Sequence, residues 1–215
     1  MKQEIKTILW DFDGVILDSM SIRDWGFRQI FKHYANEYVS KLIDYHRING
    51  GLSRYVKIRY FYEVLLGKSI TEDKVLQYAE AFSVLMKQEL TNPQNLIIDS
   101  VNFIKENYKK YSFHIVSGSD QTELRFLCKK LGLESYFISI HGSPTPKTEL
   151  VNNLLKHYDY KKENTCLIGD SINDYEAATA NNISFYGYNN KKLKETEKSY
   201  IDDFKYLKDN GKNNT

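Results

Sequence analysis

The sequence predicts an α/β protein, with a Rossmann-like parallel sheet that carries helices on both faces and an inserted α-helical cap. Five short apolar runs alternate with helical stretches, a pattern typical of parallel strands that are buried on both faces. Small or acidic residues follow each run. A long, almost entirely helical segment separates the first run from the other four, so we expect the cap to follow the first strand.

The apolar runs are expected to form the strands of one sheet. The first is Thr7–Trp10, which leads into Asp11-Phe12-Asp13-Gly14, and the later ones are Phe113–Val116, Tyr136–Ile140, Cys166–Ile168 and Ile183–Tyr186. In open parallel sheets, ligands bind beyond the carboxyl ends of the strands. The polar residues that follow these runs are therefore the candidate site residues.

The helical segment is predicted to be a cap made of residues 18–92, with the core made of residues 1–17 and 93–215. Apolar residues recur in it at helical spacing, first at Tyr55, Ile58, Tyr62 and Leu65, then at Val75, Tyr78, Ala79, Phe82 and Leu85. Asn92-Pro93 ends it, because a residue before proline is pushed out of the α region. An insertion at this point would lie over the mouth of the sheet.

The composition of the 215 residues is that of an ordinary globular protein, with 41% hydrophobic residues and a formal net charge of +2. This balance gives no basic field for nucleic acid, and no apolar run approaches the ~20 residues that span a membrane. The chain start lacks the apolar core of a secretory signal, and Cys128 and Cys166 are interpreted as reduced packing residues. We expect a cytoplasmic protein without nucleic-acid or membrane partners, either a monomer or a weak dimer.

Asp11 and Asp13 form the first candidate pair. Two carboxylates two residues apart at a strand end point to the same side, and Gly14 lets the chain turn directly after them. One carboxylate can attack phosphorus while the other acts as acid and base. An Asp-Gly turn after a buried strand explains the same residues equally well.

The stretch Gly169–Asp174 supplies two more carboxylates. Asp170 closes another buried run, where it and Asp11 would suit Mg²⁺, which prefers one or two carboxylates together with substrate phosphate. Asp174 lies in the first turn of the next helix, and with Ser171 it also fits a structural capping box.

Ser117 and Lys147 are the candidate phosphate-binding side chains. Ser117 ends the second run, Gly118 permits close backbone approach, and a helix opens at Ser119 or Asp120, a combination that suits phosphate. A simple helix N-cap is the alternative. Lys147 lies in the first turn of a helix, where a lysine opposes the helix dipole, unless it is merely solvated.

Charge favours the catalytic interpretation of this set. Asp11, Asp13, Asp170 and Asp174 would carry −4 around one pocket, and each like-charge pair at ~4 Å costs about 4 kcal/mol at an effective dielectric constant near 20. Mg²⁺ and Lys147 would bring the charge to −1, and a proton on Asp13 would bring it to zero. The sequence therefore predicts a pocket that receives a phosphate dianion, with Asp13 as the proton donor.

These residues resemble the motifs of the haloacid-dehalogenase-like hydrolases, in the helical-cap subgroup of phosphoglycolate phosphatase and β-phosphoglucomutase. The first motif is matched by Asp11–Val15, the second by Ser117, the third by Lys147 and the fourth by Gly169–Asp174, in the family's order. The resemblance covers nearly the whole chain up to about Asn190. It implies the predicted fold and a shared catalytic apparatus.

The resemblance assigns the chemical steps to the first motif. It implies that Asp11 is the nucleophile that takes the phosphoryl group and that Asp13 protonates the leaving alcohol and then activates water. It further implies that Asp11, the backbone carbonyl of Asp13 and Asp170 hold Mg²⁺.

The resemblance also assigns substrate contacts. Ser117 and Gly118 with Lys147 would bind the phosphoryl oxygens, and Asp174 would orient Lys147 and metal-bound water. In many relatives the lysine stands before a proline, whereas here Lys147 follows Pro146, which leaves Lys156 or a cap residue as the alternative cation.

In the cap, the stretch Asn49–Arg54 looks like the substrate-specificity loop of capped relatives. Arg54 could bind a second anionic group of the substrate through both arms of its guanidinium group. The alternative is a solvated arginine at a helix start.

The function implied is that of a Mg²⁺-dependent phosphoric monoester hydrolase that acts on a small phosphorylated metabolite such as a sugar phosphate through an aspartyl-phosphate. Asp13 favours phosphotransfer over dehalogenation, and Asp174 favours a phosphatase because similar mutases often carry Gly there. A phosphomutase of the β-phosphoglucomutase type is one alternative. A non-hydrolytic phosphoacceptor is another, although the cap and Asp13 argue against it.

Overall fold

The computed structural model describes residues 4–196 and 199–205, and the last part of the expected core, residues 206–215, lies outside this range. Within it the strands form one all-parallel sheet in the order β3-β2-β1-β4-β5-β6. The strands are β1 (Thr7–Trp10), β2 (Ser112–Asp120), β3 (Ser139–Ser143), β4 (Thr165–Gly169), β5 (Ser184–Tyr188) and β6 (Tyr200–Ile201). The predicted α/β class is confirmed.

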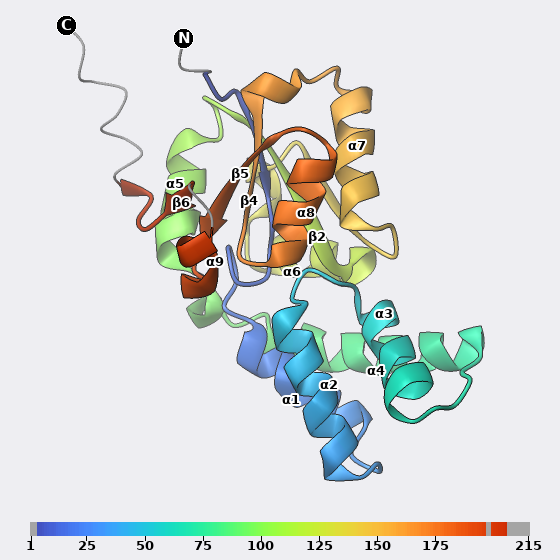
Figure 1. Ribbon diagram of the computed structural model, residues 1–215. Helices are drawn as coiled ribbons and strands as arrows, with labels where there is room; N and C mark the ends of the chain where they lie inside the picture. Colours follow the sequence, from blue (N-terminus) through green and yellow to red (C-terminus); the bar gives the residue numbers. More distant parts are fainter. Residues whose placement is uncertain (1–3, 197–198, 206–215) are drawn as a thin grey trace, which may run out of the picture.

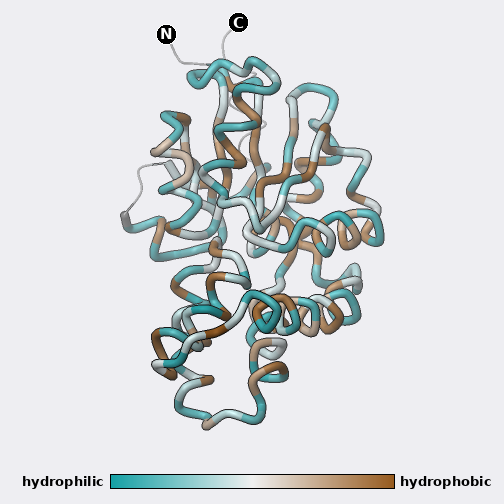
Figure 2. Tube along the Cα trace, turned by 90° about the vertical axis from the view of Figure 1, so that its right-hand side faces the viewer, coloured by the Kyte–Doolittle hydropathy of each residue, from teal (hydrophilic) through white to brown (hydrophobic). Residues whose placement is uncertain are grey.

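Helices cover both faces of this sheet (Figure 1). Because successive strand residues point to opposite faces, Ile8 and Trp10 pack with α5 (Ile98–Asn107) and α6 (Gln121–Lys130). Leu9 packs on the other face with α7 (Lys147–His157) and α8 (Ile172–Ala180). The short helix α9 (Lys191–Thr196) follows β5. Hydrophobic stretches run along the strands in Figure 2, while the helices alternate between hydrophobic and hydrophilic residues.

A helical insertion lies between β1 and β2 in the chain. Its helices are α1 (Met20–Ile30), α2 (Asn36–Ile48), α3 (Arg54–Arg59), which continues as a π-helix over Tyr60–Leu65, α4 (Glu72–Glu89) and α5. In Figure 1 α1 to α4 lie together beyond one end of the sheet, whereas α5 lies beside it. The boundary of the cap at residues 18–92 remains a prediction.

Aromatic packing holds the cap helices together. The rings of Phe31 and Phe61 stack at 4.0 Å and those of Phe27 and Phe82 lie 4.5 Å apart, all four in the buried core. Thr71 accepts a hydrogen bond from the backbone N–H of Lys74 and caps α4. Most of the stability of such amphipathic helices comes from this packing.

The predicted strand over Tyr136–Ile140 is wrong by about three residues. Tyr136 ends a 3₁₀ turn and its ring packs edge-on against Tyr108, which is 37% exposed, so the apolar run begins before strand pairing does. β3 starts at Ser139 and continues through Gly142, where a Cβ atom would lie 2.4 Å from the carbonyl oxygen of Ser119. β3 extends beyond Ile140 because its neighbour β2 continues to Asp120, which pairs with Ser143. The short strand β6 was not predicted from the sequence.

Strand order reverses between β1 and β4, and this places a ligand site where their carboxyl ends meet. Among the described helices, none combines the length and the hydrophobicity needed to cross a membrane. Cys128 and Cys166 are buried and unbridged, as the packing interpretation requires.

Candidate active site

Asp11 and Asp170 follow neighbouring strands at this switch point. The register pairs Trp10 with Ile168, and the N–H of Asp11 donates to the carbonyl of Ile168 at 2.9 Å. Gly14 turns the chain here with φ +77°, and a Cβ atom on it would lie 2.0 Å from Oδ2 of Asp170. Glycine is therefore needed both for the turn and for the approach of the Asp170 carboxylate.

Asp11, Asp170 and Asp174 form an acidic cluster in which one oxygen of each residue lies within 4.8 Å of the others. Burial and the charge of Asp174 raise the pKa of Asp11 to about 7. Burial and the charges of Asp11 and Asp174 raise the pKa of Asp170 well above its usual range. Hard oxygen ligands that repel one another fit a divalent cation such as Mg²⁺, which would relieve the repulsion.

Lys147 lies inside this cluster. Its Nζ donates to Oδ1 of Asp11 at 2.8 Å and to Oδ1 of Asp174. Burial opposes the charge of Lys147, but Asp11 and Asp174 outweigh it and hold the pKa of the ammonium above its usual range. The alternative cation, Lys156, is exposed.

Asp174 combines the two roles between which the sequence could not decide. Its Oδ2 accepts hydrogen bonds from the backbone N–H of Ser171 at 3.0 Å and from the hydroxyl at 2.6 Å, which completes a capping box on α8. Its other oxygen binds Lys147. The helix cap therefore fixes the carboxylate that holds the lysine.

Ser117 is buried on β2, level with the Asp11–Asp13 turn because Trp10 pairs with Ile115. Its hydroxyl accepts a hydrogen bond from the N–H of Ser119 at 3.1 Å. At Gly118 a Cβ atom would lie 2.3 Å from the carbonyl oxygen of Gly51. The predicted specificity loop of the cap thus rests directly on the expected phosphate cradle.

Asp13 differs from the expectation that it carries a proton. Its Oδ1 accepts hydrogen bonds from Ser19 at 2.5 Å and Arg23 Nε at 2.7 Å, and its Oδ2 accepts one from Ser119 at 2.5 Å. Burial raises the pKa of this carboxyl, but the charge of Arg23 and the hydroxyl donors outweigh burial and lower it. Asp13 is therefore ionised in this arrangement, because a cap arginine supplies its counter-charge.

Arg54 is also not the solvated arginine of the alternative interpretation. It is buried, and its Nη1 lies 2.6 Å from the hydroxyl of Ser83 and 2.7 Å from Oε2 of Glu123. Oε1 of Glu123 lies 3.2 Å from Nη1 of Arg23. Glu123 on α6 thus joins two arginines of the cap to the core.

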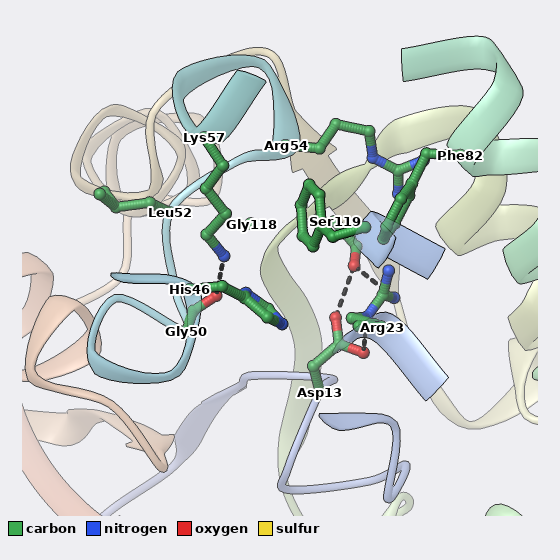
Figure 3. Close-up of a pocket in the computed structure, with 11 residues that line it drawn as sticks. Asp13, Arg23, His46, Gly50, Leu52, Arg54, Lys57, Phe82, Gly118 and Ser119 are labelled. Carbon is green, nitrogen blue, oxygen red and sulfur yellow. Dashed lines mark hydrogen bonds and ion pairs between the residues drawn. The ribbon is translucent and has the colours of Figure 1, made fainter. Parts of the chain in front are cut away.

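A cavity lies between cap and core (Figure 3), and the side chains that line it include Asp13, Arg23, Ser119, Arg54, Lys57, His46 and Phe82. Its volume is about 20 Å³, close to the space of a single water. The cavity has room for nothing larger, so a phosphate ester can occupy it only if the cap moves. The sequence missed Arg23, Lys57 and Glu123, and it considered Ser119 only as a possible helix start, because their roles depend on how the cap meets the core.

Comparison with known proteins agrees with this geometry. Residues 8–188 match the family described as haloacid dehalogenase-like hydrolase. The phosphoglycolate phosphatase of Vibrio parahaemolyticus is 23% identical over 207 residues, 87% of each chain. The phosphorylated carbohydrates phosphatase of Thermotoga maritima is 24% identical over 195 residues, 85% of each chain.

The fold is also similar to that of a solved β-phosphoglucomutase from Clostridium difficile. The TM-score is 0.73 at 16% identity, and the match covers 95% of this chain and 96% of that one. At such identity the likeness concerns the fold alone.

Proposed function

The chain belongs to the haloacid dehalogenase-like hydrolase family, and from this premise we propose that it is a Mg²⁺-dependent phosphatase of a small phosphate monoester such as a sugar phosphate. The observation that carries the proposal is the contact of Lys147 with Asp11 inside the acidic cluster. A carboxylate beside a fixed cation suits attack on a phosphoryl group, whose oxygens need neutralising. The names of the two relatives support the same reaction.

The first half-reaction transfers the phosphoryl group to the protein. An oxygen of Asp11 attacks phosphorus, and the bond from phosphorus to the ester oxygen breaks. Asp13, once protonated, gives its proton to that leaving oxygen, so an alcohol departs and an aspartyl-phosphate remains. Because the contact with Arg23 keeps Asp13 ionised, we infer that substrate binding must weaken that contact before Asp13 can carry a proton.

The second half-reaction returns Asp11 to its carboxylate form. Water attacks phosphorus, Asp13 takes the proton of that water, and the acyl-phosphate bond breaks to release inorganic phosphate. Lys147, with the hydroxyl of Ser117 and the backbone at Gly118, binds the phosphoryl oxygens in both steps. Asp174 keeps Lys147 in place.

Mg²⁺ would be held by Asp11, Asp170 and the backbone carbonyl of Asp13, and it would act as a Lewis acid on the phosphoryl oxygens. Asp11 and Asp170 need a cation because burial and mutual repulsion raise both of their pKa values. Asp13 contributes through its backbone in this proposal, since its carboxylate already binds Ser19, Arg23 and Ser119.

The test is hydrolysis of an aryl phosphate in the presence of Mg²⁺ by the wild type and by Asp11→Asn. We expect the variant to lose about 10³-fold or more in kcat, since a covalent step is removed. Asp18→Asn is the matched control, because this exposed aspartate follows the same turn. Activity of Asp11→Asn within tenfold of the wild type would refute the proposed nucleophile.

The same assay separates the two alternatives. A phosphomutase would need a sugar bisphosphate as primer and would release little inorganic phosphate. A phosphoacceptor would show a phosphoaspartate that survives for minutes. We expect steady release of phosphate without a primer, because Asp13 can activate water.

A further inference from the structure

Lys57 on α3 is a buried cation with no carboxylate partner among the described residues. It is only 3% exposed, and its Nζ donates to the carbonyl of Gly50 at 3.1 Å. A backbone carbonyl does not neutralise an ammonium group, and an unpaired buried charge is strongly unfavourable. The side chain nevertheless lines the cavity between cap and core.

The other two cations of this cavity already have counter-charges. Arg23 binds both Asp13 and Glu123, and Arg54 binds Glu123 together with the hydroxyl of Ser83. The guanidinium group of Arg54 also lies over the ring of Phe82 at 4.7 Å. Arg23 and Arg54 therefore have carboxylate partners, whereas Lys57 has none among the described residues.

Other buried polar groups that line the cavity have no hydrogen-bond partner. Nη2 of Arg54 has no hydrogen-bond partner, and neither has the single N–H of the neutral His46 ring, which is 2% exposed and whose Nε2 lies 3.8 Å from Oδ1 of Asp24. In Figure 3 Lys57 and His46 lie on one side of the cavity, while Asp13 and Arg23 lie across from them. Buried donors without partners at one cavity indicate a polar ligand that completes them.

We propose that Lys57 binds a second anionic group on the leaving group of the substrate, so that the enzyme prefers phosphate monoesters that also carry a carboxylate or a further phosphate. This rests on the proposed function, because Asp13 marks the side of the site where the leaving group departs. Arg54, which the sequence favoured for this role, is committed to Glu123, and it contributes only its free Nη2.

The proposal has a consequence for proton uptake. Burial and the charges of Arg23 and Arg54 lower the pKa of Lys57 to about 7, while Asp13 and Asp11 act in the opposite direction. His46, the other titratable group at this wall, has its pKa lowered well below its usual range by burial and by Lys57. A bound anion would raise the pKa of Lys57, so binding above pH 7 would require a proton.

The experiment compares three short esters with the magnesium-loaded enzyme: 2-phosphoglycolate, ethane-1,2-diol bisphosphate and the uncharged analogue 2-hydroxyethyl phosphate. The readout is the ratio of kcat/KM for each anionic ester to that for the uncharged one. We expect a ratio of about ten or more in the wild type, since hydrogen bonds to charged groups are the stronger ones. Comparison of the two anionic esters shows whether the site prefers a carboxylate or a second phosphate.

Lys57→Met should lower this ratio about tenfold, chiefly through KM, and Lys57→Arg should restore part of it. Lys68→Met, an exposed lysine of the same cap, is the control for a general loss of positive charge. A ratio near one in the wild type, or an equal loss for all three esters in Lys57→Met, would overturn the inference and leave the phosphatase standing. If the wild type hydrolysed none of the three esters, both the inference about Lys57 and the proposed phosphatase function would be refuted.

If Lys57→Met does not fold, the wild type alone supplies the test. Between pH 7 and 9 the ratio should fall as Lys57 loses its proton, because the phosphate groups of all three esters are then fully ionised. A ratio that stays constant over this range would overturn the inference.

Discussion

Glu123 of the core and Arg54 of the cap form an ion pair at 2.7 Å, and both side chains are buried. Glu123 also lies 3.2 Å from Arg23, so one carboxylate of α6 holds two helices of the cap. Substrate can occupy the cavity beside Asp13 only when cap and core move apart, because the cavity has room for about one water. The strength of this pairing therefore affects both stability and the rate of cap opening.

Glu123→Gln should destabilise the protein, because it leaves two buried guanidinium groups without their shared counter-charge. Removing one partner of a buried pair costs about 3–5 kcal/mol. The free energy of unfolding in urea measures this loss. Glu149→Gln, at an exposed position of α7, is the control. A midpoint equal to that of the wild type would mean that solvent compensates for the lost charge and that Glu123 does not hold the cap.

Magnesium should bind more weakly at low pH. Asp11, with its pKa raised to about 7, and Asp170, whose pKa is raised well above its usual range, must lose their protons before they can bind the ion. In the metal-free protein the native state holds these protons where the unfolded chain does not, so their contribution to stability falls as pH rises toward 7.

The measurement is the shift in Tm produced by Mg²⁺ at pH 6, 7 and 8. We expect the apparent Kd to weaken by about tenfold per pH unit below 7 for each proton displaced. Asp170→Asn should abolish the shift. A shift that is equal at all three pH values would contradict the raised pKa values.

Arg23→Met should move the alkaline limb of the pH–rate profile upward. The general acid Asp13 works only when protonated, and Arg23 lowers its pKa against the effect of burial. Without Arg23 the pKa of Asp13 rises, so activity persists to higher pH. The profile of kcat/KM for an aryl phosphate tests this, because kcat/KM reports the ionisation of the free enzyme. An alkaline limb that does not move would contradict the effect of Arg23 on Asp13.

The sequence was sufficient for the parts of the site that lie on the sheet. β1 lies at the residues predicted for it, because a short apolar run followed by an aspartate is typical of a buried parallel strand. The structure also brings Asp11, Asp170 and Lys147 together. Lys147 reaches the cluster although it follows Pro146, since α7 begins at that residue. Local pattern and strand order determine these positions.

The sequence was not sufficient where cap and core meet. The ionised state of Asp13 depends on Arg23, and the engagement of Arg54 depends on Glu123, which in the sequence is only an acid in the first turn of a helix. Such contacts depend on how the cap is oriented on the core, and the spacing of residues along the chain does not specify that orientation.

Gly118→Ala should hinder closure of the cap while leaving the core stable. The added Cβ would lie 2.3 Å from the carbonyl oxygen of Gly51, whereas the backbone of Gly118 is not in the left-handed region. The contact joins the expected phosphate cradle to the specificity loop, so relief requires that the loop move away. We expect kcat/KM to fall by at least about tenfold, because a shift of ~1 Å in a positioning group can cost 10²-fold.

Gly50→Ala is the matched control for this contact. A Cβ at Gly50 would lie 3.7 Å from Cβ of Ser171, an ordinary packing distance, so the same loop gains a methyl group without a clash. Urea unfolding of Gly50→Ala should stay close to that of the wild type, whereas Gly118→Ala should lose the part of the stability that the Glu123 ion pairs contribute, since opening the cap relieves the clash. Equal activity of the two variants would show that the enzyme does not need the loop to close on Gly118, and the closed arrangement would then not be the reactive one.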